Sequence, residues 1–248
     1  MKQTLVTFER ATVSAIGREQ PILDNLTINF YDGDFVVVIG ANGSGKSTLL
    51  KLVDERCPLT AGAVIYQQDD GAIATLTQDV DEATYPSLTV FENCRLTSSE
   101  FAIDRTQLIL YLNRFHPALG DKLDDLCCTL SGGQRQALAL ALCLLDRPQM
   151  LLLDEHTSAL DPVTQHQLMS ITAKEAESVQ LTMMVTHDLQ DALTYGNRLI
   201  VMSNGRISGD YAEEQKQALT LTDLFGLLSQ GSTDKTGGSH VCSARRAV

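Results

Sequence analysis

The chain has 248 residues, 44% of them hydrophobic, so it can bury a sizeable core as one large domain or two small ones. Its formal net charge of −12 argues against an electrostatic nucleic-acid surface, and we expect no nucleic-acid partner. No apolar run approaches the roughly 18 residues that span a bilayer, and the N-terminal residues lack the apolar segment of a signal peptide. The six cysteines show no C-x-x-C spacing, which favours reduced thiols in a cytoplasmic protein.

In chain order, residues 4–8 and 22–30 are the first segments with strand character. Asp32-Gly33 forms a turn signal between the second of them and the apolar run 35–39, which indicates an antiparallel layer leading into a central strand. The run 35–39 is strongly β-branched. That pattern is typical of a strand buried on both faces of a parallel sheet.

A glycine-rich stretch follows that strand and fits G-x-x-x-x-G-K-[ST], the phosphate-binding loop. Apolar residues at helical spacing over 48–53 supply the helix that the motif requires, which argues against a chance match. Glycines let the backbone wrap a phosphate closely, and the loop N–H groups face anionic oxygens at the helix N-terminus. Lys46 would neutralise the β- and γ-phosphates, and the Ser47 hydroxyl would ligate Mg²⁺. We expect the nucleotide to contact Gly40, Ala41, Asn42, Gly43, Ser44, Gly45, Lys46, Ser47 and Thr48.

Residues 63–67 and 73–77 are predicted to be two further short strands, and the second ends at Gln78. From about residue 79 to 146 helical patterns dominate, which predicts a helical subdomain inserted between strands. Thr89 and Glu92 form a capping box there. The segment 130–134 leads from this subdomain into a long helix.

Residues 150–153 and 181–186 are again predicted to be buried strands, ending at Asp154 and His187. Asn204-Gly205 is a hairpin signal between two later strands. Strands that alternate with helices predict an α/β doubly wound core, whose ligands bind beyond the carboxyl ends of the strands. Gln78, Asp154, His187 and the loop at Gly40 should therefore converge on one edge of the sheet. The Ser-, Gly- and Thr-rich tail 229–248 is predicted to be disordered.

The residue types at these strand ends suggest chemical roles. Asp154 could hold the Mg²⁺ shell, although a strand-end carboxylate can also cap a turn. Glu155 could polarise an attacking water as general base. Ser131 and Gln134 form a capping box whose N–H groups also make an anion site. A helix terminus contributes about 0.3–1 kcal/mol, whereas micromolar ATP binding needs roughly 8 kcal/mol, so this second cradle would close on a nucleotide already held by Lys46.

Six motifs in this order make the chain resemble the ATP-binding cassette family of ATPases over roughly residues 3–228. The resemblance implies one ATPase domain over 1–228, with a P-loop NTPase (RecA-like) core, an antiparallel β layer and the inserted helical subdomain. The motifs are Walker A at 40–47, the Q-loop Gln78, the signature Leu130-Ser131-Gly132-Gly133-Gln134, Walker B at 151–154 with Glu155, the D-loop Ser158-Ala159-Leu160-Asp161 and the switch histidine His187.

The resemblance also implies cofactors, partners and location. ATP and Mg²⁺ are the expected cofactors, with Glu155, His187 and Gln78 catalytic and with Ser47, Gln78 and Asp154 around the metal. Ser131, Gly132, Gly133 and Gln134 would contact the nucleotide of a partner copy in a head-to-tail homodimer with two ATPs, near the D-loop Asp161. Separate transmembrane permease subunits would contact residues 85–93, on the inner face of the cell membrane. A secreted substrate-binding protein would serve the permease.

Two positions depart from the family pattern. His156 stands where most members have proline, and with residues 196–200 it resembles a branch linked to binding-protein-dependent uptake of aromatic amino acids. A histidine there frees φ and predicts hydrolysis that depends on pH between about 6 and 8. Ile16 holds the place of the aromatic residue that usually stacks on adenine, which predicts weak discrimination among bases unless another aromatic, such as Phe8, takes that role.

Two other readings stay open at this point. A soluble cassette could act on nucleic acid or ribosomes, but this chain has one Walker A, no heptad run and an acidic balance. A scaffold cassette in iron–sulfur cluster assembly would bind soluble partners, and the sequence excludes it less firmly. The main prediction is the ATPase subunit of a membrane transporter, most simply an importer.

Overall fold

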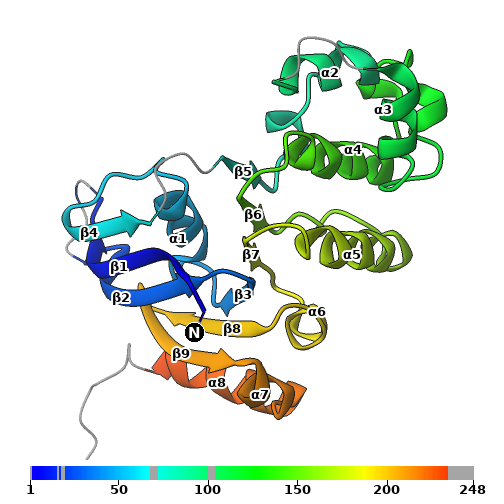
Figure 1. Ribbon diagram of the computed structural model, residues 1–248. Helices are drawn as coiled ribbons and strands as arrows, with labels where there is room; N and C mark the ends of the chain where they lie inside the picture. The colour runs from blue at the N-terminus through cyan, green and yellow to red at the C-terminus, as the bar shows by residue number, and fades with distance from the viewer. Residues whose placement is uncertain (1, 16, 18–19, 68–71, 100–103, 234–248) are drawn as a thin grey trace, which may run out of the picture.

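The computed structural model describes residues 2–15, 17, 20–67, 72–99 and 104–233, which form two sheets flanked by helices (Figure 1). An antiparallel sheet has the order β2-β1-β4, and a mixed sheet has the order β5-β6-β7-β3-β8-β9. The predicted antiparallel layer and parallel core are therefore both present. The strands are β1 (Thr4–Val13), β2 (Leu23–Tyr31), β3 (Asp34–Gly40), β4 (Ala61–Tyr66), β5 (Ile73–Leu76), β6 (Met150–Asp154), β7 (Leu181–Val185), β8 (Arg198–Ser203) and β9 (Arg206–Ala212).

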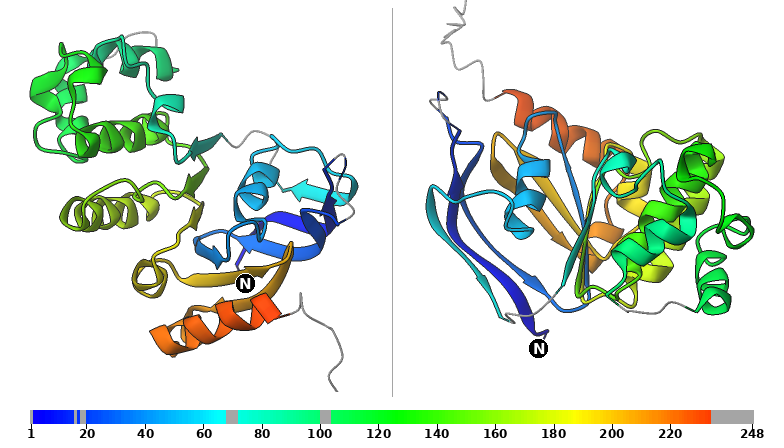
Figure 2. Two further views of the ribbon diagram at one scale, coloured as in Figure 1. Left: turned by 180° about the vertical axis from the view of Figure 1, so that it is seen from behind. Right: turned by 90° about the horizontal axis from the view of Figure 1, so that it is seen from above.

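The helices alternate with these strands and cover both faces of the mixed sheet (Figure 2). Helix α1 lies on the face toward the antiparallel sheet, and α4, α5 and α6 lie on the opposite face. The helices are α1 (Lys46–Val53), α2 (Val90–Thr97), α3 (Arg105–Leu112), α4 (Gly132–Leu144), α5 (Pro162–Ala176), α6 (Leu189–Thr194), α7 (Glu213–Gln217) and α8 (Leu221–Thr233), with 3₁₀ turns η1 (Val80–Glu82), η2 (Gly120–Lys122) and η3 (Cys127–Thr129).

Strand β3 separates the two halves of the hydrophobic core, because successive side chains of a strand point to opposite faces. Val36 and Val38 pack in one cluster with α1 and the antiparallel sheet. Val37 and Ile39 belong to the other cluster, with α4 and α5. This two-sided burial explains why the parallel strands are uninterrupted apolar runs rather than alternating ones.

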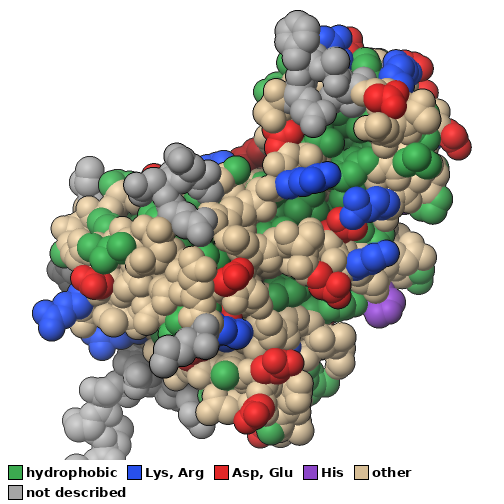
Figure 3. Space-filling model, viewed as in Figure 1, with side chains coloured by type: hydrophobic (Ala, Val, Ile, Leu, Met, Phe, Trp, Pro, Cys, Tyr) green, Lys and Arg blue, Asp and Glu red, His purple; other side chains and the backbone are tan. Residues whose placement is uncertain are grey.

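The helical segment between β5 and β6 holds α2, α3 and α4 and lies to one side of the sheet (Figure 1). Side-chain caps define its helix starts: Thr89 and Glu92 make the predicted capping box, and Asp104 accepts from Thr106 N at the start of α3. On the face shown in Figure 3, hydrophobic side chains gather over this segment, whereas charges of both signs are spread over the molecule.

Two sequence-based boundaries change. Helix α8 continues to Thr233, so the tail predicted from residue 229 is helical at its beginning, and residues 234–248 lie outside the described residues. Strands β4 and β5, which follow each other in the chain, belong to different sheets. β4 pairs with β1, which extends to Val13 rather than to the predicted residue 8.

A buried arginine connects the two sheets. Arg198 on β8 donates from Nη1 to Asp34 Oδ2 (2.9 Å) and to Asn29 O of β2 (2.8 Å), and it forms two further bonds with Asp210 of β9. Its side chain is only 12% exposed. A charge this deeply buried is tolerated because each side of the guanidinium has an anionic or carbonyl acceptor.

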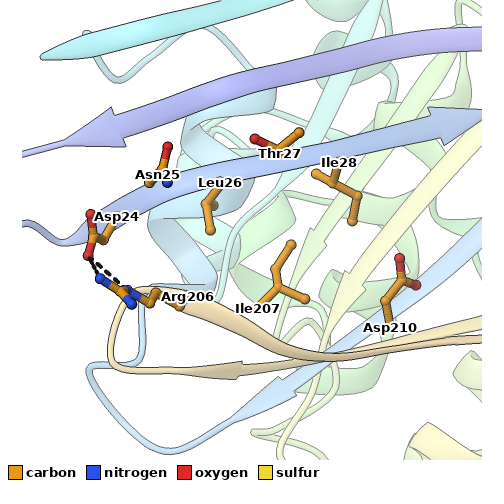
Figure 4. Close-up of a pocket in the computed structure, with 8 residues that line it drawn as sticks. All are labelled: Asp24, Asn25, Leu26, Thr27, Ile28, Arg206, Ile207 and Asp210. Atoms are coloured by element: carbon orange, nitrogen blue, oxygen red, sulfur yellow. Dashed lines mark hydrogen bonds and ion pairs between the residues drawn. The ribbon is translucent and has the colours of Figure 1, made fainter.

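An exposed arginine bridges the same two sheets at the other end of a groove. The groove, of about 390 Å³, lies between β2 and β9, and Arg206 Nε donates to Asp24 Oδ2 (2.8 Å) across it (Figure 4). The Arg206 side chain is 70% exposed. The two arginines therefore make comparable bonds between the sheets in very different environments.

We expect Arg198→Met to lower the free energy of unfolding by about 2 kcal/mol, because the buried Asp34 loses a largely buried ion-pair partner and keeps the pair with the exposed Lys2. The matched variant Arg206→Met should cost less than about 1 kcal/mol, since water screens that pair. Urea unfolding of both variants measures the difference. If both variants lost the same free energy of unfolding, burial would not be the reason that the Arg198 ion pairs stabilise the fold.

Candidate functional site

The register of the parallel strands brings the predicted site residues to one edge of the sheet. Val38 of β3 aligns with Val185 of β7, and Val185 aligns with Asp154 of β6. Leu76 of β5 aligns with Leu153 of β6. The chain leaves each strand at nearly the same level, so the segments after β3, β5, β6 and β7 meet beyond their carboxyl ends.

The loop between β3 and α1 has the backbone that the glycine motif predicts. A Cβ on Gly40 would lie 2.4 Å from Met202 O and 2.6 Å from Ser44 Oγ, so a side chain does not fit there. Gly45, the N-cap of α1, has φ +104 and lies against Leu23, which again excludes a Cβ. The loop therefore closes on itself at the N-terminus of a helix, where an anion is favoured.

Lys46 turns back toward this loop. Its Nζ donates to Gly40 O (2.9 Å) and Ala41 O (3.2 Å), and the side chain is buried. Burial lowers the pKa of Lys46, while the nearby Glu155 and Asp154 carboxylates raise it. The Ser44 hydroxyl is buried and has no hydrogen-bond partner among the described residues. A cation and an unsatisfied polar atom inside a glycine loop fit a phosphate group.

Asp154 and Ser47 have the chemistry of a magnesium site. Asp154 Oδ1 is buried and unpartnered among the described residues, burial raises the pKa of this carboxyl, and the Ser47 hydroxyl bonds to it. No cluster of three or more His, Cys, Asp or Glu side chains forms a metal site in the described part of the chain. Mg²⁺ normally uses one or two carboxylates together with substrate phosphates, so this donor set fits it.

Glu155 and His187 are in direct contact. His187 Nε2 lies 2.5 Å from Glu155 Oε1. Glu155 N donates to Val185 O, which ties the turn after β6 to the end of β7. The structure therefore brings together the residues predicted as general base and switch histidine, one from each of two adjacent strands.

Gln78 lies near the phosphate-loop edge of the sheet, whereas the signature segment lies at the start of α4. Gln78 is exposed two residues beyond the end of β5, at the same edge of the sheet. Ser131 caps α4 by accepting from Gln134 N, and the Gln134 side chain accepts from Ser131 N, which is the predicted capping box. α4 and α1 lie on opposite faces of the sheet (Figures 1 and 2).

The signature lies beside the D-loop instead. A Cβ on Gly133 would be 2.6 Å from Thr164 Cγ2 in the first turn of α5. Asp161 caps that helix by accepting from Val163 N and Thr164 N, and the Thr164 hydroxyl lowers the pKa of Asp161 by donating to it (2.6 Å). Exposed Asp161 and Ser131 therefore belong to one surface.

Comparison with known proteins decides the family. A family model described as ABC transporter matches residues 23–158, just over half of the chain. The chain belongs to the ABC transporter family. "Tyrosine transport ATP-binding protein" of Clostridioides difficile (strain R20291) is 35% identical over 231 residues, which cover 84% of this chain and 91% of that protein. "Aliphatic sulfonates import ATP-binding protein SsuB 1" of Burkholderia cenocepacia (strain HI2424) is 34% identical over 82% of this chain but only 64% of its own length.

Solved structures confirm the fold of this ABC ATPase domain. The dimeric bacterial ABC transporter cassette MJ0796 is 27% identical with a TM-score of 0.72, over 84% of this chain and 99% of that one. A post-hydrolysis dimer of MJ0796 bound to ADP and Pi has a TM-score of 0.70 at 26% identity over the same shares. The predicted ATP-binding α/β fold is confirmed. Within the described part of this ABC domain, no helix is both long enough and apolar enough to span a membrane.

His156 is where the structure overturns a sequence-based expectation for this ABC domain. Its side chain is 2% exposed, and burial lowers the pKa of His156 to about 4. The expectation that it titrates near neutrality is therefore wrong. Its Nε2 lies 3.1 Å from Thr172 Oγ1 of α5, a partner that sequence reasoning missed. The available signal was that Thr172 shares the spacing of Leu168 and Ala176 on the buried face of α5.

The adenine end of the predicted nucleotide site is only partly described. Ile16 lies outside the described residues. Phe8 is fully buried against Phe30, with ring centroids 5.6 Å apart, so it is not available to stack on a base.

The burial of His156 predicts a pH dependence of stability. An unfolded histidine has a pKa near 6.5, so between pH 6.5 and 4 the unfolded chain binds a proton there that the native chain does not. The free energy of unfolding should then fall as pH falls. From pH 7 to pH 5 the wild type should lose about 2 kcal/mol more than His156→Gln, which cannot titrate. Urea unfolding at both pH values measures this, and equal losses would contradict the buried neutral state.

Proposed function

We propose that this ABC domain is the ATP-hydrolysing subunit of an importer. The observation that carries the proposal is the convergence of Lys46, Asp154 and the Glu155–His187 pair at one edge of the sheet. Beside it lies the glycine loop, where the Ser44 hydroxyl has no hydrogen-bond partner among the described residues. Transfer of a phosphoryl group to water needs mainly positioning and charge neutralisation. This edge supplies both.

Each residue has a distinct role in the proposed reaction. Lys46 leaves its carbonyl partners for the β- and γ-phosphates, and the loop N–H groups bind the remaining phosphate oxygens. Ser47, Asp154 and Gln78 would hold Mg²⁺, which would neutralise negative charge on the phosphates. Glu155 accepts a proton from the attacking water. His187 contacts the Glu155 carboxylate and would also contact the γ-phosphate.

A second copy completes the proposed site. The exposed signature residues Ser131 and Gly132 are at the start of α4, on the opposite face of the sheet from α1, so we assign them to a nucleotide bound by another chain. The MJ0796 cassettes are dimeric. A head-to-tail pair with two-fold symmetry places each signature over the other copy's loop and gives two equivalent ATP sites.

The permease contact is proposed at residues 85–93, after the Q-loop. Tyr85 is 58% exposed, yet its backbone is fixed, because Asn93 Oδ1 accepts from Tyr85 N (2.7 Å) and Asn93 Nδ2 donates to Tyr85 O (3.1 Å). The exposed Leu126 pairs with Thr89 beside it. A rigid loop that presents an aromatic and an aliphatic side chain suits docking to an apolar groove.

The relatives support an importer of aromatic amino acids. The Clostridioides difficile relative is named for tyrosine transport and matches nearly its whole length. We therefore propose permease subunits and a secreted binding protein as partners, with the ABC domain held at the cytoplasmic face of the membrane. The named relatives are transport and import subunits, and they give no support to the iron–sulfur alternative.

Affinity purification of the tagged chain from membranes of its own host tests this proposal. A polytopic membrane protein should co-purify with the wild type, and Tyr85→Glu should lose most of it, because a charge would be buried at the contact. Leu110→Glu is the control, since Leu110 is equally exposed but lies on α3. Recovery of soluble partners alone, unaffected by Tyr85→Glu, would contradict the importer assignment.

Glu155→Gln should slow hydrolysis about 100- to 10,000-fold while it retains ATP binding, because it keeps the shape of the side chain and removes the base. The variant should accumulate as an ATP-bound dimer on size-exclusion chromatography. Glu177→Gln, at the exposed end of α5, should behave like the wild type. Turnover of Glu155→Gln within a few-fold of the wild type would exclude Glu155 as the base.

Lys46→Ala should have the opposite effect on ATP binding and on formation of the ATP-bound dimer. It removes charge-assisted contacts to phosphate and should weaken ATP binding by about 3 kcal/mol, roughly 100-fold. Lys51→Ala, on the exposed side of the same helix, should bind ATP normally. If Lys46→Ala still formed an ATP-bound dimer, the proposed role of Lys46 in phosphate binding would be wrong.

A further inference from the structure

The buried His156 adjoins the proposed base but has no role in the mechanism above. It directly follows Glu155, and its imidazole is 2% exposed and lies inside the core. Its hydrogen bond therefore needs another explanation. Burying a polar side chain costs free energy unless it is hydrogen-bonded, and an apolar side chain at this position would avoid that cost.

The backbone at Glu155 is strained. Its φ is +51, in the left-handed region that a residue with a Cβ seldom adopts. Such a conformation persists only where the surroundings hold it on both sides. On one side, Glu155 N donates to Val185 O (3.0 Å). On the other side, the next side chain is His156.

His156 is anchored to the middle of α5. Thr172, which is fully buried, donates from Oγ1 to Leu168 O (2.9 Å). A hydroxyl has one proton, so with that proton committed to Leu168, Thr172 Oγ1 accepts from His156 Nε2 at 3.1 Å. This order of bonds requires a hydrogen on Nε2. Because burial lowers the pKa of His156, the ring that carries it is the neutral Nε2–H tautomer.

The anchor also closes the D-loop. The chain leaves His156, passes through the D-loop to Asp161, and enters α5, which carries Thr172 on its buried face. The bond between residues 156 and 172 therefore fixes both ends of the D-loop to one helix. A proline at position 156 would restrict φ there but could not make this contact.

We propose that His156 is a positioning residue that holds the strained Glu155 backbone through its hydrogen bond to Thr172, and thereby aims the Glu155 carboxylate. The inference rests on the proposed role of Glu155 as general base. The His156 side chain is 2% exposed and lies in the core. It acts only through the orientation of its neighbour.

Four variants of the full chain test the hydrogen bond itself. His156→Gln keeps an N–H close to the position of Nε2, and Thr172→Ser keeps the hydroxyl. His156→Leu and Thr172→Val remove donor and acceptor at similar volume. The last two should lower kcat for ATP hydrolysis about 10- to 100-fold, with KM within about twofold of the wild type. The first two should retain most of kcat, and His156→Leu/Thr172→Val should be no slower than either single variant.

Two measurements separate positioning from a merely structural role. Amide hydrogen exchange of residues 157–161 in the nucleotide-free chain should speed up in His156→Leu and Thr172→Val only. Urea unfolding shows whether each variant is folded in the assay. Normal kcat in folded His156→Leu, or equal loss in His156→Gln and His156→Leu, would overturn the proposal. Glu155→Gln, assayed beside them, distinguishes the failures: if it is inactive while His156→Leu is normal, only the positioning role is wrong, whereas a normal Glu155→Gln overturns the base and the positioning role together.

Discussion

The register of three buried strands, β6, β7 and β3, is the constraint on which the site depends. Because Val38, Val185 and Asp154 lie at one level, the phosphate loop, Glu155 and His187 leave the sheet side by side. A slip of one residue would turn every side chain of a strand to the other face. Both faces of β3 are packed, so such a slip would disrupt two cores at once. The precision of the site thus comes from apolar packing.

The charge of the whole chain and the charge of the site have opposite consequences for ATP. A net charge of −12 repels an anion at long range, but exposed charges are screened beyond about 8 Å at physiological salt. At short range the buried Lys46 and the loop N–H groups dominate, because the surroundings screen them weakly. Lys46 is bonded to two carbonyls and faces two carboxylates. In the proposed site, phosphate oxygens would replace the two carbonyls as hydrogen-bond acceptors for Lys46.

Local patterns predicted most of the fold and the family, because their signals lie within a few residues of each other. The run 35–39, the glycine loop and the capping boxes at Thr89 and Ser131 are such signals, and the structure contains them all. Contacts between distant segments could not be predicted in this way. The partners of Arg198 lie more than 160 residues away on one side and 12 on the other, and Thr172 is 16 residues from His156. Burial, which no local pattern showed, is what made the expected titration of His156 wrong.

Helix α5 connects the features that the proposed dimer would need to coordinate. Thr164 in its first turn contacts the signature at Gly133, and the next residue, Gln165, donates to Asp188 (3.3 Å) and Asp191 (2.9 Å) at the start of α6. Asp188 directly follows His187, just as His156 directly follows Glu155. One helix therefore holds the neighbours of both members of the Glu155–His187 pair and carries the D-loop at its start. Energetic coupling between sites needs a contiguous packed element that both sites can bias. In this chain α5 is such an element for the proposed dimer, because its first turn contacts the signature and its middle holds His156, the residue that we propose positions Glu155.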